Sequence, residues 1–295
     1  MLVSMPTNVS ASVLGDDAQV IKIMADVGFD AFDISVERPV EWDKFPNTYV
    51  MDLPDFKEHA QYLHDLGQSL GIPCCAAHAP CATSSADPEI NEILFHKLVR
   101  AAEAAAIVGA NAIVVHPILY PANHPLREHQ WRLNLDLYRR LLPYARDFGI
   151  RVAVENLIEW KNDYRTPGPS MHRHPEEFCR FLDELDSEWF TVCLDFGHAV
   201  CSDASIPDMI RTLGKERLYM LHVHDNDLKA DHHTVPYLGN IDFDACIKAL
   251  QDIGFDSVLD FEVNIVRFPK ELIRPAARFI CETGMNLKQR IQGIL

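Results

Sequence analysis

Short apolar runs alternate with amphipathic segments along almost the whole chain. Eight of these runs have the length of strands, and they lie at about residues 2–6, 30–36, 72–78, 111–116, 150–155, 190–195, 218–224 and 257–262. Most of them are continuously apolar, whereas a strand with one face in water alternates apolar and polar residues. Continuous apolar runs are typical of strands that are covered on both faces. The pattern therefore predicts a buried sheet of parallel strands.

The segments between these strands carry helical patterns. Seven such patterns lie at residues 16–28, 55–71, 88–109, 129–149, 175–186, 243–254 and 269–284. Several strands begin directly after a glycine that ends a helical pattern, as in GIPCCAAH, GANAIVVH and GIRVAVEN. This recurring order implies repeated βα units. Eight units form a (β/α)8 TIM barrel, and we expect residues 1–295 to be one such domain. A doubly wound sheet is the structural alternative.

Residues that can bind a metal stand at the ends of at least six of the predicted strands. The residues in question are His78, His116, Glu155, Asp195 and Glu262, together with His222, His224 and Asp225 in the seventh strand segment. The carboxyl ends of all strands in a (β/α)8 barrel meet on one face, where active sites lie. A doubly wound sheet would not place ligands on so many strands. The sequence therefore predicts a catalytic metal site on this face.

Glu155 and Glu262 are the strongest candidates, because each ends an apolar run where an unpaired charge is costly. The alternative for each is a salt bridge to an arginine or lysine of the barrel. Asp195 and His222 stand at equivalent strand ends and favour the metal. Three carboxylates and one imidazole form an oxygen-rich site that suits Mn²⁺, Mg²⁺, Zn²⁺, Fe²⁺ or Co²⁺.

Other histidines and aromatic residues lie in the segments that follow the strands. His198 stands in LDFGH, while Asp231 and His233 lie in the loop after the seventh strand. Each of these alone is more often a structural residue, so the argument depends on their joint position. Trp42 and Trp160 lie in the two long connections at 37–54 and 156–174, where they are candidates for the wall of a substrate pocket or for simple loop packing.

The charge balance changes which partners are expected. The chain has 27 lysine and arginine residues against 43 aspartate and glutamate residues, which gives a net charge of −16. Such a surface repels polyanions, so nucleic acid is not an expected partner. The absence of a basic leader and of a long apolar run predicts neither export nor a membrane span. Eight cysteines without a CxxC pair indicate reduced thiols and a cytoplasmic location, and homo-oligomerisation is left open.

Several short motifs, taken together, resemble the xylose-isomerase-like TIM-barrel superfamily. They are HAP at 78–80, VVHP at 114–117, VEN at 154–156, LDFGH at 194–198, LHVHD at 221–225, the stretch 231–243 and FEV at 261–263. The superfamily contains sugar isomerases, ketose 3-epimerases, inosose dehydratases and isomerases, and apurinic-site endonucleases. The set is specific for the superfamily and not for one reaction. YLGN at 237–240 departs from the glycine-rich turn that members often show, so the substrate-facing loop there is expected to differ.

The resemblance implies two sets of metal ligands. Single-metal epimerases of the superfamily would use Glu155, Asp195, His222 and Glu262. The endonucleases bind three zinc ions, and the nine matching positions are His78, His116, Glu155, Asp195, His198, His222, Asp231, His233 and Glu262. All nine are present, and sugar-processing members retain several of them too. The ligand count therefore leaves both reactions open.

Two enzymatic functions follow, and we favour the first. It is isomerisation or epimerisation of a small sugar, sugar phosphate or polyol ketone, with Glu155 and Glu262 as acid and base. A phosphate on the substrate could be bound by Lys229 or Arg173. The alternative is an apurinic-site phosphodiesterase, which needs a positive groove, whereas basic residues of the loops are scattered. A ligand-binding barrel without activity is a third reading, which the carboxylate pair disfavours.

Overall fold

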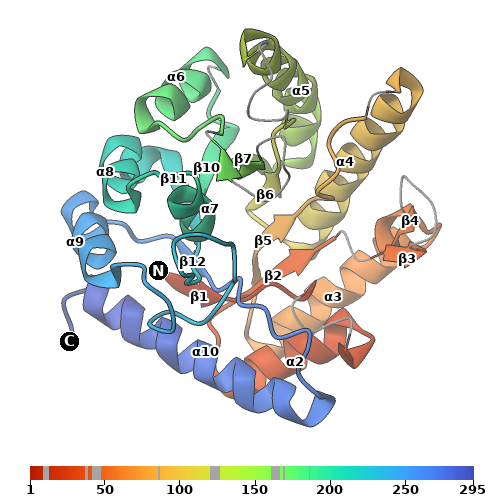
Figure 1. Ribbon diagram of the computed structural model, residues 1–295. Coiled ribbons are helices and arrows are strands. Elements are labelled where there is room, and N and C mark those ends of the chain that lie inside the picture. The colour runs from red at the N-terminus through yellow and green to blue at the C-terminus, as the bar shows by residue number, and fades with distance from the viewer. Residues whose placement is uncertain are drawn as a thin grey trace.

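The computed structural model describes residues 1–8, 13–36, 39–41, 48–85, 87–119, 127–160, 167–168, 170–185 and 187–295. Eight parallel strands form a ring at its centre (Figure 1). In ring order they are β1 (Leu2–Ser4), β12 (Val258–Asp260), β11 (Leu218–His222), β10 (Phe190–Asp195), β7 (Arg151–Glu155), β6 (Ala112–Val115), β5 (Cys74–His78) and β2 (Phe32–Ser35). The ring closes where the chain after β1 meets β2, since the Thr7 amide donates to the Asp33 carbonyl at 3.0 Å.

Helices surround the ring on its outside (Figure 1). They are α2 (Asp17–Val27), α3 (Phe56–Leu70), α4 (Pro88–Val108), α5 (Arg127–Phe148), α6 (Pro175–Leu185), α8 (Ile206–Arg217), α9 (Phe243–Ile253) and α10 (Lys270–Ile291), with the short α7 (Phe196–Cys201) and the 3₁₀ turn η1 (Val50–Asp52). The predicted (β/α)8 barrel is confirmed, and the doubly wound alternative is wrong. Helix α8 was not predicted from the sequence.

The helix-ending glycines act as the sequence pattern indicated. Gly28, Gly71 and Gly109 each follow a helix with a positive φ, the left-handed conformation that only glycine adopts without strain. Each therefore turns the chain back into the next strand. One apolar cluster fills the space between strands and helices. A smaller one, which includes Ala153 and Met220, fills the interior of the ring, so the barrel is packed and is not a pore.

The structure differs from the predictions at several strand ends and connections. Strands β6 and β12 end at Val115 and Asp260, so His116 and Glu262 follow their strands and do not close them. The long connections contain two short antiparallel pairs, β3 (Pro39–Glu41) with β4 (Thr48–Tyr49) and β8 (Glu159–Trp160) with β9 (Pro167–Gly168). None of the described helices has the length and apolar character needed to cross a membrane.

Candidate metal centre

Glu155, the last residue of β7, is enclosed by four histidines. Its side chain is only 1% exposed. One carboxylate oxygen, Oε1, lies 3.1 Å from Nδ1 of His222 and 3.3 Å from Nδ1 of His198. The other, Oε2, lies 3.0 Å from Nε2 of His116 and 3.6 Å from Nε2 of His78. The ends of β5, β7 and β11, the residue after β6 and helix α7 therefore all contribute to the surroundings of one carboxylate.

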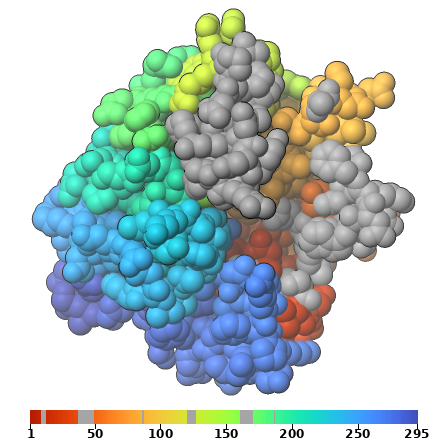
Figure 2. Space-filling model, in the orientation of Figure 1, coloured from red at the N-terminus to blue at the C-terminus, as the bar shows by residue number. Residues whose placement is uncertain are grey.

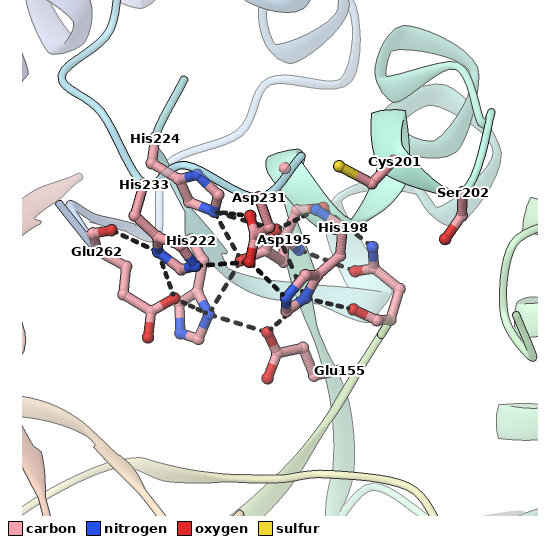
Figure 3. Close-up of polar contacts among 12 residues, drawn as sticks. Glu155, Asp195, His198, Cys201, Ser202, His222, His224, Asp231, His233 and Glu262 are labelled. Atoms are coloured by element: carbon pink, nitrogen blue, oxygen red, sulfur yellow. Dashed lines mark hydrogen bonds and ion pairs between the residues drawn. The ribbon is translucent and has the colours of Figure 1, made fainter. Parts of the chain in front are cut away.

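Three carboxylates converge on the same nitrogen of His222 (Figure 3). Besides Glu155, Nδ1 of His222 faces Asp195 Oδ2 at 3.6 Å and Glu262 Oε2 at 3.5 Å. Asp195 and His222 are register partners on the neighbouring strands β10 and β11, which fixes their approach. The structure thus brings together the four residues that the sequence analysis proposed as ligands.

A second group of side chains adjoins the first. His224 Nε2 lies 3.1 Å from Asp195 Oδ2, and His198 Nε2 lies 3.4 Å from Asp231 Oδ2. Asp231 Oδ2 is 2.7 Å from His233 Nε2, and the His233 and His224 rings stack at 4.0 Å. His233 Nδ1 lies 3.6 Å from Glu262 Oε2, which links this group back to the first. All nine positions of the endonuclease-like set, and His224 with them, belong to this one network.

Three other sequence candidates have different outcomes. Trp42 lies outside the described residues. The backbone of Trp160 lies in β8, and its side chain is outside the described part of the structure. Its role in a pocket wall therefore stays a prediction. Asp225 does not contact the cluster of carboxylates and histidines, and instead organises the loop that follows β11.

Asp225 is fully buried and accepts four backbone hydrogen bonds from this loop. The donors are the amides of Asn226 at 2.8 Å, Tyr237 at 2.9 Å, Gly239 at 2.9 Å and Ile241 at 3.0 Å. A Cβ on Gly239 would lie 2.4 Å from Asp225 Oδ1, so only glycine allows this approach. The loop carries Asp231 and His233, and Asp225 therefore helps to place them. The sequence signal that was available is an aspartate directly after a buried strand.

Asp225→Ala is expected to lower the free energy of unfolding by about 3 kcal/mol or more, because four amides lose a charged acceptor. Denaturant titration measures this loss, and hydrogen exchange of the Tyr237, Gly239 and Ile241 amides should accelerate. Asp242→Ala is the matched control, since Asp242 caps α9 through one bond, to the Ala245 amide, and should cost about 1 kcal/mol. Equal losses in the two variants would contradict the role of Asp225.

Two further residues of the motifs hold the cluster together. A Cβ on Gly197 would lie 2.1 Å from His224 Cε1 and 2.7 Å from Asp231 Oδ1, so the glycine of LDFGH gives these side chains their space. The Asn156 side chain donates to the Asp195 carbonyl at 2.9 Å and accepts from the Asp195 amide at 2.8 Å. This pair of bonds fixes the end of β10 against the end of β7.

The electrostatics of the cluster are set by carboxylates and imidazoles alone. Burial would raise the pKa of Glu155, but His222 and His116 hold it well below its usual value. Burial would likewise raise the pKa of Asp195, and His198 and His224 hold it low. None of the ion pairs among the described residues brings a lysine or arginine to these carboxylates. The salt-bridge alternative for Glu155 and Glu262 therefore finds no support in the described part of the chain.

The histidines show the opposite shift. Burial would lower the pKa of His222, but the charges of Glu262 and Glu155 raise it well above its usual value. Burial also opposes the protonation of His233, whereas its bond to Asp231 and the charge of Glu262 raise its pKa to about 9. Without a metal, the cluster therefore balances ionised carboxylates with protonated imidazoles.

The donor set fits a divalent metal. Ligand atoms of His198, Asp231 and His233 all lie within 4.8 Å of one another, and so do those of His224, His233 and Glu262. Oδ1 of Asp231 is buried and has no hydrogen-bond partner among the described residues. Carboxylate oxygens and imidazole nitrogens at such separations suit Mn²⁺, Zn²⁺, Co²⁺, Fe²⁺ or Mg²⁺.

Fold and site together define a class of protein. The family model described as xylose isomerase-like TIM barrel matches residues 21–283. The chain belongs to this family, which confirms the resemblance seen in the motifs. Among its relatives is the uncharacterized protein MJ1311 of Methanocaldococcus jannaschii, which is 23% identical over 249 residues, or 83% of this chain and 78% of that protein.

Solved structures share the fold over the whole chain. A D-tagatose 3-epimerase-like protein superposes with a TM-score of 0.76 and 21% identity, and the match covers 100% of this chain and 98% of that one. The IOLI protein, whose crystal structure has a binding zinc atom, gives a TM-score of 0.73 and 17% identity over 99% of this chain and 98% of its own. At sequence identities this low, the structural match shows a common fold and nothing more.

Proposed function

We propose that this protein is a divalent-metal-dependent isomerase or epimerase of a small sugar, sugar phosphate or polyol ketone. The observation that carries the proposal is the convergence of Glu155, Asp195 and Glu262 on His222 Nδ1, at 3.1, 3.6 and 3.5 Å. The names of the structural neighbours, which include an L-ribulose 3-epimerase, support the same class of substrate.

In this proposal Glu155, Asp195, His222 and Glu262 hold the metal. When bound, a divalent metal supplies electrophilic stabilisation for the substrate oxygens as negative charge develops on them. The donor atoms come from four different strands or strand ends of a packed barrel, so their relative positions change little without a change in the barrel itself.

Glu262 and Glu155 are the proposed acid and base. Glu262 is the more accessible, with 19% of its side chain exposed against 1% for Glu155. In this proposal Glu262 takes the proton from the carbon next to the substrate carbonyl. Glu155 stands at the end of β7, several strands away around the ring, and would return a proton from another side. Proton transfers of this kind contribute roughly 10²- to 10⁴-fold to a rate.

A cavity beside Glu262 offers room for such a substrate. It has a volume of about 180 Å³ and is lined by Asn8, His233, Glu262, Asn264 and Val266. Oδ1 of Asn8 is buried and has no hydrogen-bond partner among the described residues. In Figure 2 the red N-terminal segment is visible in a recess beside the blue segment that leads into α10. Carboxamides and a carboxylate around a small cavity favour a polyhydroxylated ligand.

One observation supports a second function. All nine positions of the endonuclease-like ligand set lie in a single network. An apurinic-site phosphodiesterase would need to attract DNA, and binding to phosphates depends on lysine and arginine. The net charge of −16 opposes this. Sugar chemistry is therefore the better supported of the two.

Metal-loaded protein, incubated in parallel with a panel of ketoses and inososes and with an abasic-site DNA duplex, separates the two functions. We expect an epimer or isomer of at least one sugar and no cleavage of the duplex at low salt, where electrostatic binding is strongest. Efficient metal-dependent cleavage without turnover of any sugar would overturn the proposal.

Metal binding should release protons and weaken as the pH falls. The pKa of His222 is raised well above its usual value and that of His233 to about 9, so both are protonated at pH 7 in the metal-free protein. A metal binds only the unprotonated imidazole nitrogen and must displace the proton. Calorimetry in two buffers of different ionisation enthalpy measures this proton release. The apparent affinity of the protein for the metal should rise as the pH approaches 9. Binding without proton release would contradict the assignment of His222 as a ligand.

A further inference from the structure

Two aspartates lie inside the barrel next to the proposed metal ligands. Asp33 on β2 and Asp260 on β12 are both fully buried. Asp260 precedes Glu262 by two residues and is the register partner of His222 on β11. Asp33 pairs in register with Ala76, two residues before His78. Both side chains therefore belong to the floor of the site, where neither a substrate nor solvent reaches them.

Most of the oxygens of this pair have no partner. Oδ1 of Asp260 accepts a hydrogen bond from the Ser4 hydroxyl. Oδ2 of Asp260 and both oxygens of Asp33 have none among the described residues. No lysine or arginine of the described chain forms an ion pair with either aspartate. A buried carboxylate without a partner is costly, so a donor is expected close by.

The histidine His222 lies close enough to be the donor for these two aspartates. One of its ring nitrogens lies within 4.8 Å of a carboxylate oxygen of both Asp33 and Asp260. Its Nδ1 already faces Glu155, Asp195 and Glu262. The ring has one other nitrogen, Nε2, which points away from Nδ1 and is left for the aspartate pair. Metal-binding histidines commonly donate their second N–H to a carboxylate, which fixes the tautomer and the ring orientation.

Neither aspartate hydrogen-bonds to His222 in this structure, although both lie close to its ring. We propose that Asp33 and Asp260 are positioning residues: when a metal is bound at Nδ1, an oxygen of one of them accepts the Nε2–H of His222 and so keeps Nδ1 directed at the metal. The inference rests on the proposed metal site, and it is independent of the reaction that the metal serves. Cys193 is the competing partner, since its sulfur also lies within 4.8 Å of His222. A thiol is a much weaker hydrogen-bond acceptor than a carboxylate, which favours the aspartates.

Zinc affinity of the purified protein tests this role without any substrate. Asp33→Asn and Asp260→Asn keep the side-chain shape and replace the carboxyl group by a weaker acceptor, so each should weaken Zn²⁺ binding by about 10-fold, and the double variant by up to about 100-fold. Competition with a chromophoric chelator measures the affinity. The melting temperature of the metal-free double variant should not fall, because an amide of the same shape replaces a buried carboxyl group whose pKa is raised by burial. A merely structural role would lower that temperature and leave the affinity unchanged.

The controls distinguish the aspartates from their surroundings. Asp17→Asn makes the same change at a buried carboxylate on α2, outside the barrel interior, and should leave Zn²⁺ affinity unaltered. Cys193→Ala should also bind zinc normally. A double aspartate variant that binds zinc as tightly as the unaltered protein would overturn the proposal, as would a loss of affinity in Cys193→Ala alone.

The unaltered protein gives an answer even if the variants do not fold. Its crystal structure with Zn²⁺ should show the ion on Nδ1 of His222, and an oxygen of Asp33 or Asp260 within hydrogen-bond distance of Nε2. Coordination of zinc through Nε2 would refute the inference. Absence of sugar turnover in the same preparation would count against the proposed function only.

Discussion

Replacing Glu262 by glutamine is expected to lower kcat by roughly 10²- to 10⁴-fold, because an amide oxygen can ligate a metal weakly but cannot accept a proton as a base. The fold should persist, since the side chain is partly exposed at 19% and the amide has the same shape. Steady-state kinetics on a sugar that the protein turns over measure the effect, and thermal unfolding verifies the fold.

Glu92→Gln is the matched control for this substitution. Glu92 is an exposed glutamate that pairs with Arg140 on the outside of the barrel. Its replacement makes the same chemical change far from the cluster and should leave kcat unchanged. Full activity of Glu262→Gln would remove Glu262 from the proton transfer and with it the proposed acid–base pair.

Removal of the metal is expected to abolish turnover and to reduce thermal stability. In the proposed site, three carboxylates around His222 Nδ1 would bind a divalent ion in the folded state only, and such a ligand would stabilise the fold by about 2.7 kcal/mol at one hundred times its dissociation constant. Chelation followed by dialysis should therefore lower the melting temperature. Mn²⁺, Co²⁺ and Zn²⁺ should restore activity to different extents, since their preferred geometries differ.

The metal content of the treated protein is the control for this experiment. Elemental analysis has to show less than stoichiometric metal before the loss of activity is assigned to the ion. Undiminished turnover in protein verified as metal-free would contradict the proposed mechanism, whatever the identity of the sugar.

Most of the barrel could be predicted because its strands are continuously apolar and its helices end at glycines. Helix α8 was missed because it does not have a uniform helical pattern. Gly214 lies inside it with φ 68 and ψ 169, a non-helical conformation that interrupts the periodicity. The exact ends of β6 and β12 also could not be read from the sequence, since nothing in the pattern shows that backbone pairing stops at Val115 and Asp260, before His116 and Glu262.

The candidate site could be predicted in part, because buried polar residues at strand ends are unusual. The sequence indicated which strand ends carry ligand-like residues, but not that His78 and His116 both face Glu155. Residues that act through others were missed. Asp33 and Asp260 look like minor interruptions of apolar strands, and Asp225 looks like a ligand. Only tertiary contacts show that Asp225 binds backbone amides of the loop after β11.

Hydrogen exchange into substrate tests the central claim most directly. Isomerisation or epimerisation by proton transfer breaks a C–H bond next to the carbonyl, and Glu262 or Glu155 then shares the proton with solvent. Metal-loaded protein, incubated in deuterated water with a panel of ketoses and inososes, should place deuterium on that carbon of the sugar that it converts, as seen by NMR. Conversion without deuterium would contradict the acid–base role of the glutamates. The absence of both deuterium and conversion across the panel would contradict the sugar assignment itself.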